Sequence, residues 1–136
     1  MRWNTIILVA LALFSVSCAR KPERSLVGEW KGTDSTGQTA SLVLNTDGNC
    51  KMILGNLVLD SQTVGGKMEW RADMSHDPMT LDLVITPASG KHSVLPMIFR
   101  FITDQKIQVR MSEDMQSHPT GFAADDTKNQ IVLTKR

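Results

Sequence analysis

The sequence has few aromatic residues, few cysteines and no surplus of charge of either sign. It contains no tyrosine, two cysteines, and 15 Lys and Arg against 14 Asp and Glu. Two cysteines cannot build a disulfide framework, and balanced charge argues against nucleic acid, which requires a basic surface. The apolar run of residues 6–14 falls short of the roughly 20 residues of a membrane-spanning helix. These absences leave a small protein with a single core.

The first eighteen residues resemble the export signal of a bacterial lipoprotein. Arg2 provides the charged start, residues 6–14 the apolar stretch, and Ser15-Val16-Ser17-Cys18 the small residues around the cut. In such proteins the cysteine carries palmitate and other acyl chains that anchor it in the membrane. The resemblance therefore implies a signal peptide at residues 1–17 and lipidation of Cys18. Ser15 stands where the commonest form has leucine, which leaves an ordinary signal, cut at another position, as the alternative.

Residues 18–25 would form the lipidated cysteine and a short polar tether, and residues 26–136 a single domain. Loss of Arg2 with the signal leaves 14 Lys and Arg against 14 Asp and Glu, a formal charge of zero. In the lipoprotein pattern, Ala19 in place of Asp after the cysteine implies outer-membrane placement in a Gram-negative envelope. We therefore expect a lipid-anchored protein that faces the periplasm.

Beyond the tether, apolar and polar residues alternate with a period of two. In residues 67–72, Met68, Trp70 and Ala72 share one face, and charged side chains take the other. This pattern is typical of half-buried antiparallel strands. We predict eight strands, at residues 26–33, 39–45, 49–55, 66–73, 79–86, 94–102, 105–111 and 129–135. Eight sequential strands separated by turn residues predict an all-β, up-and-down antiparallel β-barrel.

The longest irregular stretch, residues 112–128, has one expected helical turn, at Ser112–Met115. Carboxylates in such a loop are usually solvated, and we expect this of Asp125 and Asp126. No nucleophile with a neighbouring base is recognisable, so we expect neither an enzyme nor a cofactor. Cys50 lies among apolar neighbours, which favours a buried structural thiol.

Three stretches resemble known β-barrel families. Gly28-Glu29-Trp30 is similar to the Gly-x-Trp signature of lipocalins and related calycin barrels, in which the tryptophan plugs one end. Residues 70–83 and 118–136 are similar to segments of a group of small exported bacterial lipocalin-like domains, first noticed in planctomycetes, except that His118 replaces an arginine. The resemblance implies a lipocalin-like barrel. It implies no activity, because the group has none assigned.

One turn offers candidate metal ligands. Met74, His76 and Met79 lie within six residues, and soft thioether and imidazole ligands suit Cu(I). Against this, Met97 and Met111 fall on inward strand positions where methionine is flexible core filler. The histidines are scattered, which argues against zinc. We therefore assign no metal and keep a copper-handling module as an alternative function.

Binding remains the expected function. Large inward residues are the expected contacts for a small apolar ligand: Trp30, Trp70, Phe99 and Phe101. Apolar residues at outward positions instead predict a patch for an envelope protein partner: Val84, Ile98 and Ile102. The alternative for that patch is that residues 112–128 cover it. A purely structural envelope lipoprotein without a ligand is a further alternative.

Overall fold

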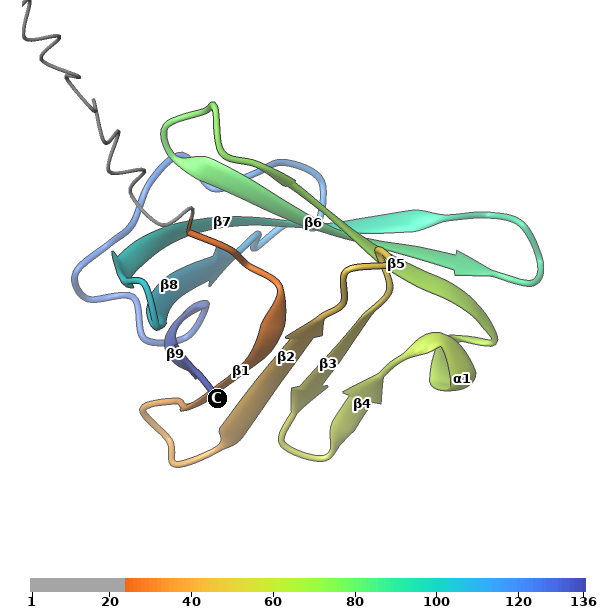
Figure 1. Cartoon of the computed structure of the whole chain (residues 1–136), viewed down its shortest axis with the longest axis horizontal. Helices are drawn as coiled ribbons and strands as arrows, with labels where there is room; N and C mark the ends of the chain where they lie inside the picture. Colours follow the sequence, from red (N-terminus) through yellow and green to blue (C-terminus); the bar gives the residue numbers. More distant parts are fainter. Residues whose placement is uncertain (1–23) are drawn as a thin grey trace, which may run out of the picture.

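The computed structural model describes residues 24–136, which form nine β-strands and one helical turn, α1 (Ser61–Val64) (Figure 1). The predicted signal peptide and Cys18 lie outside these residues. The strands are β1 (Gly28–Thr33), β2 (Thr39–Leu44), β3 (Cys50–Leu54), β4 (Leu57–Leu59), β5 (Gly66–Asp73), β6 (Met79–Pro87), β7 (Ser93–Thr103), β8 (Lys106–Met111) and β9 (Gln130–Lys135). All eight predicted strands are present, and each end lies within two residues of its predicted position. Only β4 is additional.

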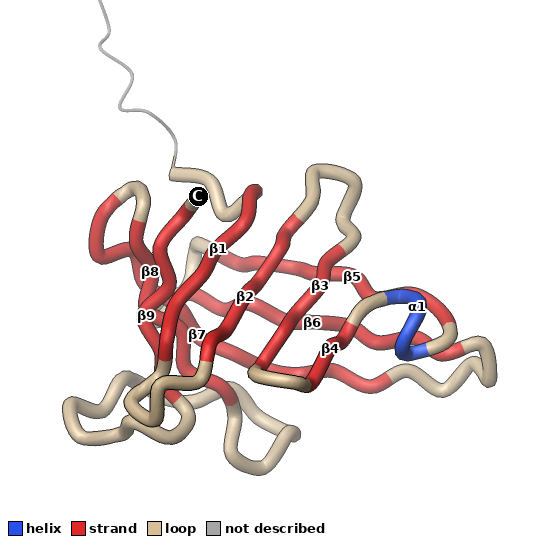
Figure 2. Tube along the Cα trace, turned by 90° about the horizontal axis from the view of Figure 1, so that it is seen from below, coloured by secondary structure: helices blue, strands red, loops and turns tan. Residues whose placement is uncertain are grey.

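The strands form one antiparallel sheet in the order β4-β3-β2-β1-β9-β8-β7-β6-β5. Each strand pairs with its neighbour in sequence, except at the seam between β4 and β5. Pairing of β1 with β9 curls the sheet into a nearly closed barrel, as Figures 1 and 2 show. The predicted all-β, up-and-down barrel is confirmed. Its closure satisfies backbone groups that open sheet edges would leave free for other chains.

Isolated contacts join the two sides of the seam. Asn49 forms a single bridge with Glu69, and the Trp70 amide donates a hydrogen bond to the Gly48 carbonyl at 2.9 Å. The Trp70 indole donates to the Asn45 carbonyl, also at 2.9 Å. Because α1 packs against β4 and β5, the seam is covered rather than open.

Two short elements beside the seam were not predicted. β4 has three residues and α1 is a single turn. Asp60 and Thr63 form a capping box at the start of α1, and Gly65 ends it with a φ of 65°, a left-handed conformation that glycine favours. Elements this short contain too few residues to show a periodic spacing of apolar residues in the sequence.

Alternate strand residues point into the barrel and form one apolar core. Its fully buried members are Leu26, Trp30, Leu44, Met68, Leu81, Leu83, Met97, Phe99 and Ile107. The Trp30 indole donates a hydrogen bond to the Leu26 carbonyl at 2.8 Å. Leu26 precedes β1, so this bond draws the indole towards the end where the chain enters the fold. That end of the barrel is filled by side chains.

The helical turn predicted at Ser112–Met115 is wrong, because Asp114 organises this segment differently. Its carboxylate accepts hydrogen bonds from the amides of Gln116 and Ser117, at 2.9 and 3.1 Å, and from the Ser112 hydroxyl at 2.8 Å. These bonds lower the pKa of Asp114, led by the Gln116 amide. Met115 has a φ of 58°, which no right-handed helix contains. Side-chain bonds to the local backbone here outcompete helix formation.

Candidate functional site

The four aromatic residues predicted to contact a ligand pack within the core instead. Trp30 and Phe99 are fully buried. The rings of Phe99 and Phe101 meet edge to face with 5.7 Å between centroids, and Trp70 is fixed at the seam. None of the four lines the apolar cavity at the mouth of the barrel. The sequence placed them correctly on the inward face, but large aromatic side chains there fill the interior of a narrow barrel.

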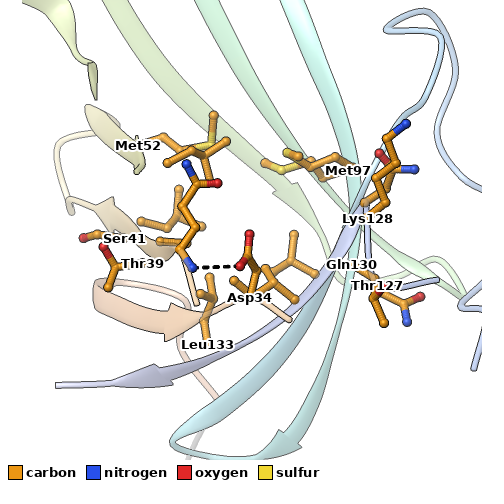
Figure 3. Close-up of a pocket in the computed structure, with 17 residues that line it drawn as sticks. Asp34, Thr39, Ser41, Met52, Met97, Thr127, Lys128, Gln130 and Leu133 are labelled. Atoms are coloured by element: carbon orange, nitrogen blue, oxygen red, sulfur yellow. Dashed lines mark hydrogen bonds between the residues drawn. The ribbon is translucent and has the colours of Figure 1, made fainter. Parts of the chain in front are cut away.

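An apolar cavity of about 130 Å³ opens at the end of the barrel remote from the chain entry. Figure 3 shows the residues that line it. It lies between the turn that follows β1 and the residues that lead into β9. Side chains of β2, β3, β7, β8 and β9 line its interior: Ala40, Leu42, Met52, Leu54, Met97, Val109, Met111, Ile131 and Leu133. The cavity is therefore a mouth of the barrel rather than a gap between packed elements.

Strand register places the lining in two walls. Leu42 pairs with Met52 across β2 and β3, and Met97 pairs with Met111 across β7 and β8. Ala40 contributes only a methyl group at the mouth, where a larger inward side chain would fill the space. Inward positions for Met97 and Met111 were predicted from alternation, and their location in the barrel wall agrees with that prediction. The space between the walls depends on contacts that alternation does not encode.

One side of the polar rim is the turn after β1. The Asp34 carboxylate accepts hydrogen bonds from the Thr36 amide at 2.9 Å, the Thr36 hydroxyl at 2.6 Å and the Gln38 amide at 2.9 Å. These bonds, led by the Thr36 hydroxyl, lower the pKa of Asp34. The carboxylate thus shapes its own turn (Figure 3), and the Gln38 side chain reaches the mouth.

The other side of the rim is held by a half-buried ion pair. Arg110 Nη2 lies 3.0 Å from Asp126 Oδ2, and the two side chains are only 20% and 13% exposed. Asp126 also accepts hydrogen bonds from the amides of Lys128 and Asn129, each at 3.1 Å, and the Asn129 bond leads the lowering of its pKa. The expectation that Asp126 is a solvated loop carboxylate is corrected: it connects β8 to the rim.

The predicted outward patch is divided by a loop. Ile98 is fully buried, although it is not part of the barrel core, because His118, Pro119 and Thr120 lie beside it on the outer face. His118 Nε2 hydrogen-bonds Asp82 Oδ1 at 2.6 Å, which ties the loop to β6. The prediction that Ile98 is exposed is therefore wrong. The alternative, in which residues 112–128 cover the patch, holds for Ile98.

The two remaining residues of that patch do not restore it. Val84 is half-buried, and Ile102 is exposed over 48% of its surface. A docking face for a protein needs a contiguous apolar area, and with Ile98 covered the outward positions of β6 and β7 no longer supply one. The structure thus favours the mouth over the outer face as the candidate site.

The turn residues considered for copper differ in their surroundings. Met74 is exposed, whereas Met79 packs against the core. His76 is 69% exposed and pairs with Asp73 at 3.2 Å. Among residues 24–136, no group of three or more His, Cys, Asp or Glu side chains is placed to hold a metal ion.

Comparison of the chain with protein-family models, curated proteins and solved structures yields no match. Within the described part of the chain, no helix has the length and apolar character needed to cross a membrane. The candidate site is accordingly defined by its own geometry: an apolar cavity at the barrel mouth with a polar rim made by the turn after β1 and the residues before β9.

Proposed function

We propose that the protein is a lipid-anchored envelope protein that binds a small apolar molecule in the mouth of its barrel. The observation that carries the proposal is the apolar cavity of about 130 Å³ beneath a polar rim. Ligand sites generally combine an apolar lining with a few polar groups that orient the ligand. In this proposal Cys18 carries the anchor, and no residue is catalytic.

The volume limits the ligand. An apolar cavity of about 150 Å³ engineered into another protein stays dry and binds benzene, so a volume of about 130 Å³ suits a single ring or the end of a short alkyl chain. A larger amphiphile would insert only one apolar end. Its polar part would then meet Gln38, Lys128 and Asn129 at the rim.

The position of the mouth is compatible with an N-terminal anchor. β1 begins at Gly28, directly after the chain enters the fold, and the rim turn follows its last residue, Thr33. Six strand residues at about 3.3 Å each separate the two ends by roughly 20 Å. Figure 2 shows the start of β1 and the β1–β2 turn at opposite ends of the fold. A chain tethered through Cys18 would therefore hold its mouth away from the membrane.

A protein partner on the outer face is the less supported alternative. Of the three patch residues, only Ile102 is largely exposed, and nothing marks the surrounding face as apolar and continuous. The structural-lipoprotein alternative makes a different prediction from ligand binding, because it requires no occupancy of the mouth. The following experiment separates it from our proposal.

Filling the mouth tests the proposal. Ala40→Ile adds a β-branched side chain to an inward β2 position on the cavity wall, so it should weaken binding at least about tenfold. We would titrate the mature chain, carrying Cys18→Ser to keep it in solution, with benzene and with cyclohexane by calorimetry. Saturable one-to-one binding of either compound, lost in Ala40→Ile, is expected.

The matched control is Ala72→Ile, because Ala72 is an exposed residue near the end of β5 and does not line the mouth. It should bind as the parent does. If Ala40→Ile unfolds, as circular dichroism would reveal, the milder Ala40→Val provides the same comparison. Absence of binding by the folded parent, or binding that survives a folded Ala40→Ile chain, would refute ligand binding in the mouth and leave the structural alternative.

A further inference from the structure

Three methionines from three strands line the mouth. Met52 belongs to β3, Met97 to β7 and Met111 to β8. Figure 3 shows Met52 and Met97 on different sides of the cavity, with their side chains directed towards the space between the strands. Met97 is fully buried and Met52 nearly so. Their thioethers are therefore part of the interior wall, which no aromatic side chain lines.

Thioether sulfur differs from an aliphatic carbon in its polarisability. A sulfur about 5 Å from an aromatic ring makes a favourable contact, often at the ring edge, beyond the contact that an alkyl group makes. Methionine is also unbranched, so its end can adjust to the plane of a bound ring. The other wall residues, such as Leu42, Val109 and Leu133, offer apolar area without this preference.

We infer that the mouth selects a ligand with a single aromatic ring, which Met52, Met97 and Met111 contact through their sulfur atoms. This inference rests on the proposed function and names its ligand class. The cavity volume of about 130 Å³ matches one six-membered ring. A polar substituent on the ring would point to the rim, where Gln38, Lys128 and Asn129 lie.

Benzene and cyclohexane form the discriminating pair of probes. Both are six-carbon apolar rings, but only benzene offers a π-system to sulfur. We expect the mature chain, with Cys18→Ser, to bind benzene roughly two- to tenfold more tightly than cyclohexane, relative to the partition of each compound between water and an alkane. Calorimetric titration gives both dissociation constants.

Removing the sulfur atoms should abolish this preference. In a chain with Met52→Leu, Met97→Leu and Met111→Leu together, apolar volume is nearly conserved, so cyclohexane affinity should stay within about twofold while the benzene preference disappears. Met68→Leu is the matched control, because Met68 is as buried as Met97 but does not line the cavity. It should leave both affinities unchanged.

The outcomes distinguish the two proposals. If neither ring binds the parent chain, the proposed function fails. If both bind with no preference for benzene, or if the triple variant keeps the preference, ligand binding stands and the thioether inference is overturned. Should the triple variant not fold, Met52→Leu and Met111→Leu are measured singly, and each must lower the preference for benzene. Equal preference in both single variants and the parent would contradict the inference.

Discussion

Cys50 illustrates how burial controls the chemistry of a single residue. Its side chain is 5% exposed at the start of β3, as its apolar neighbours predicted. Burial, with a smaller contribution from the negative charge of Glu69, raises the pKa of the thiol to about 12. Because the thiolate is the reactive form of cysteine, the folded protein keeps this residue inert.

We predict that Cys50 resists alkylation until the chain unfolds. A folded pKa of about 12 against an ordinary value near 8.5 reduces the thiolate fraction at pH 8 by a factor on the order of 10³. Mass spectrometry after iodoacetamide treatment of the Cys18→Ser chain, with and without urea, measures this. Rapid alkylation of Cys50 in the native chain would contradict its burial.

The raised pKa of Cys50 makes the free energy of unfolding depend on pH. The folded-state pKa of Cys50 lies above that of the unfolded chain, so the unfolded state releases its proton first as pH rises. The contribution of the protonated Cys50 thiol to the free energy of unfolding is complete below about pH 8.5. It is lost progressively between that value and about pH 12. Replacing Cys50 with alanine should remove this alkaline component from the pH dependence of unfolding.

At the scale of the element, alternation predicted strands well and predicted irregular segments poorly. An inward or outward position follows from neighbouring residues in one strand, which explains the agreement for Met68 and Trp70. The cover over Ile98 depends on His118, twenty residues further along the chain, and on its bond to Asp82. No local pattern reports such a contact.

The pairing of β1 with β9 is the element contact that closes the barrel, and it depends on a close approach at Gly32. A Cβ atom built on Gly32 would collide with the Val132 carbonyl oxygen, a backbone atom that cannot turn aside. Only two residue pairs define this pairing, Trp30 with Lys135 and Lys31 with Thr134. A small separation of β1 from β9 therefore weakens the pairing that closes the barrel.

We predict that Gly32→Ala destabilises the protein by about 1–3 kcal/mol, through displacement of β9 from β1. Urea unfolding followed by circular dichroism measures the change in midpoint. Gly121→Ala is the control, because a Cβ atom added to Gly121 would meet no other atom within 4 Å, and it should unfold at or slightly above the parental midpoint. Equal midpoints for the parent and Gly32→Ala would show that closure tolerates the added methyl group.

At the scale of the whole molecule, the start of β1 and the mouth lie at opposite ends of the barrel. The Lys135 ammonium donates to the Ser25 carbonyl at 3.2 Å, which fixes the incoming chain beside the C-terminal strand. Trp30 fills the interior near this end, so the free volume is left at the other. In the lipid-anchored protein that we propose, the mouth would therefore face away from the membrane.

We predict that Cys18→Ala transfers the protein from the membrane fraction to the soluble fraction, because loss of the acyl chains removes the anchor. Fractionation of cells that express the full chain measures this. Cys50→Ala is the matched control and should stay with the membrane, since Cys50 is buried in the barrel. Retention of Cys18→Ala in the membrane would overturn the lipoprotein interpretation.

By itself, the sequence determined the strands, their inward faces and the barrel class, because alternation and turn residues act over a few neighbouring positions. It also yields the lipoprotein prediction, which concerns residues that the structure does not describe. Only the tertiary structure decided where free volume remains: the aromatics fill one part of the barrel, and the methionines line another. Free volume depends on strand register, loop cover and side-chain size across facing walls, and these meet only when distant segments pack together.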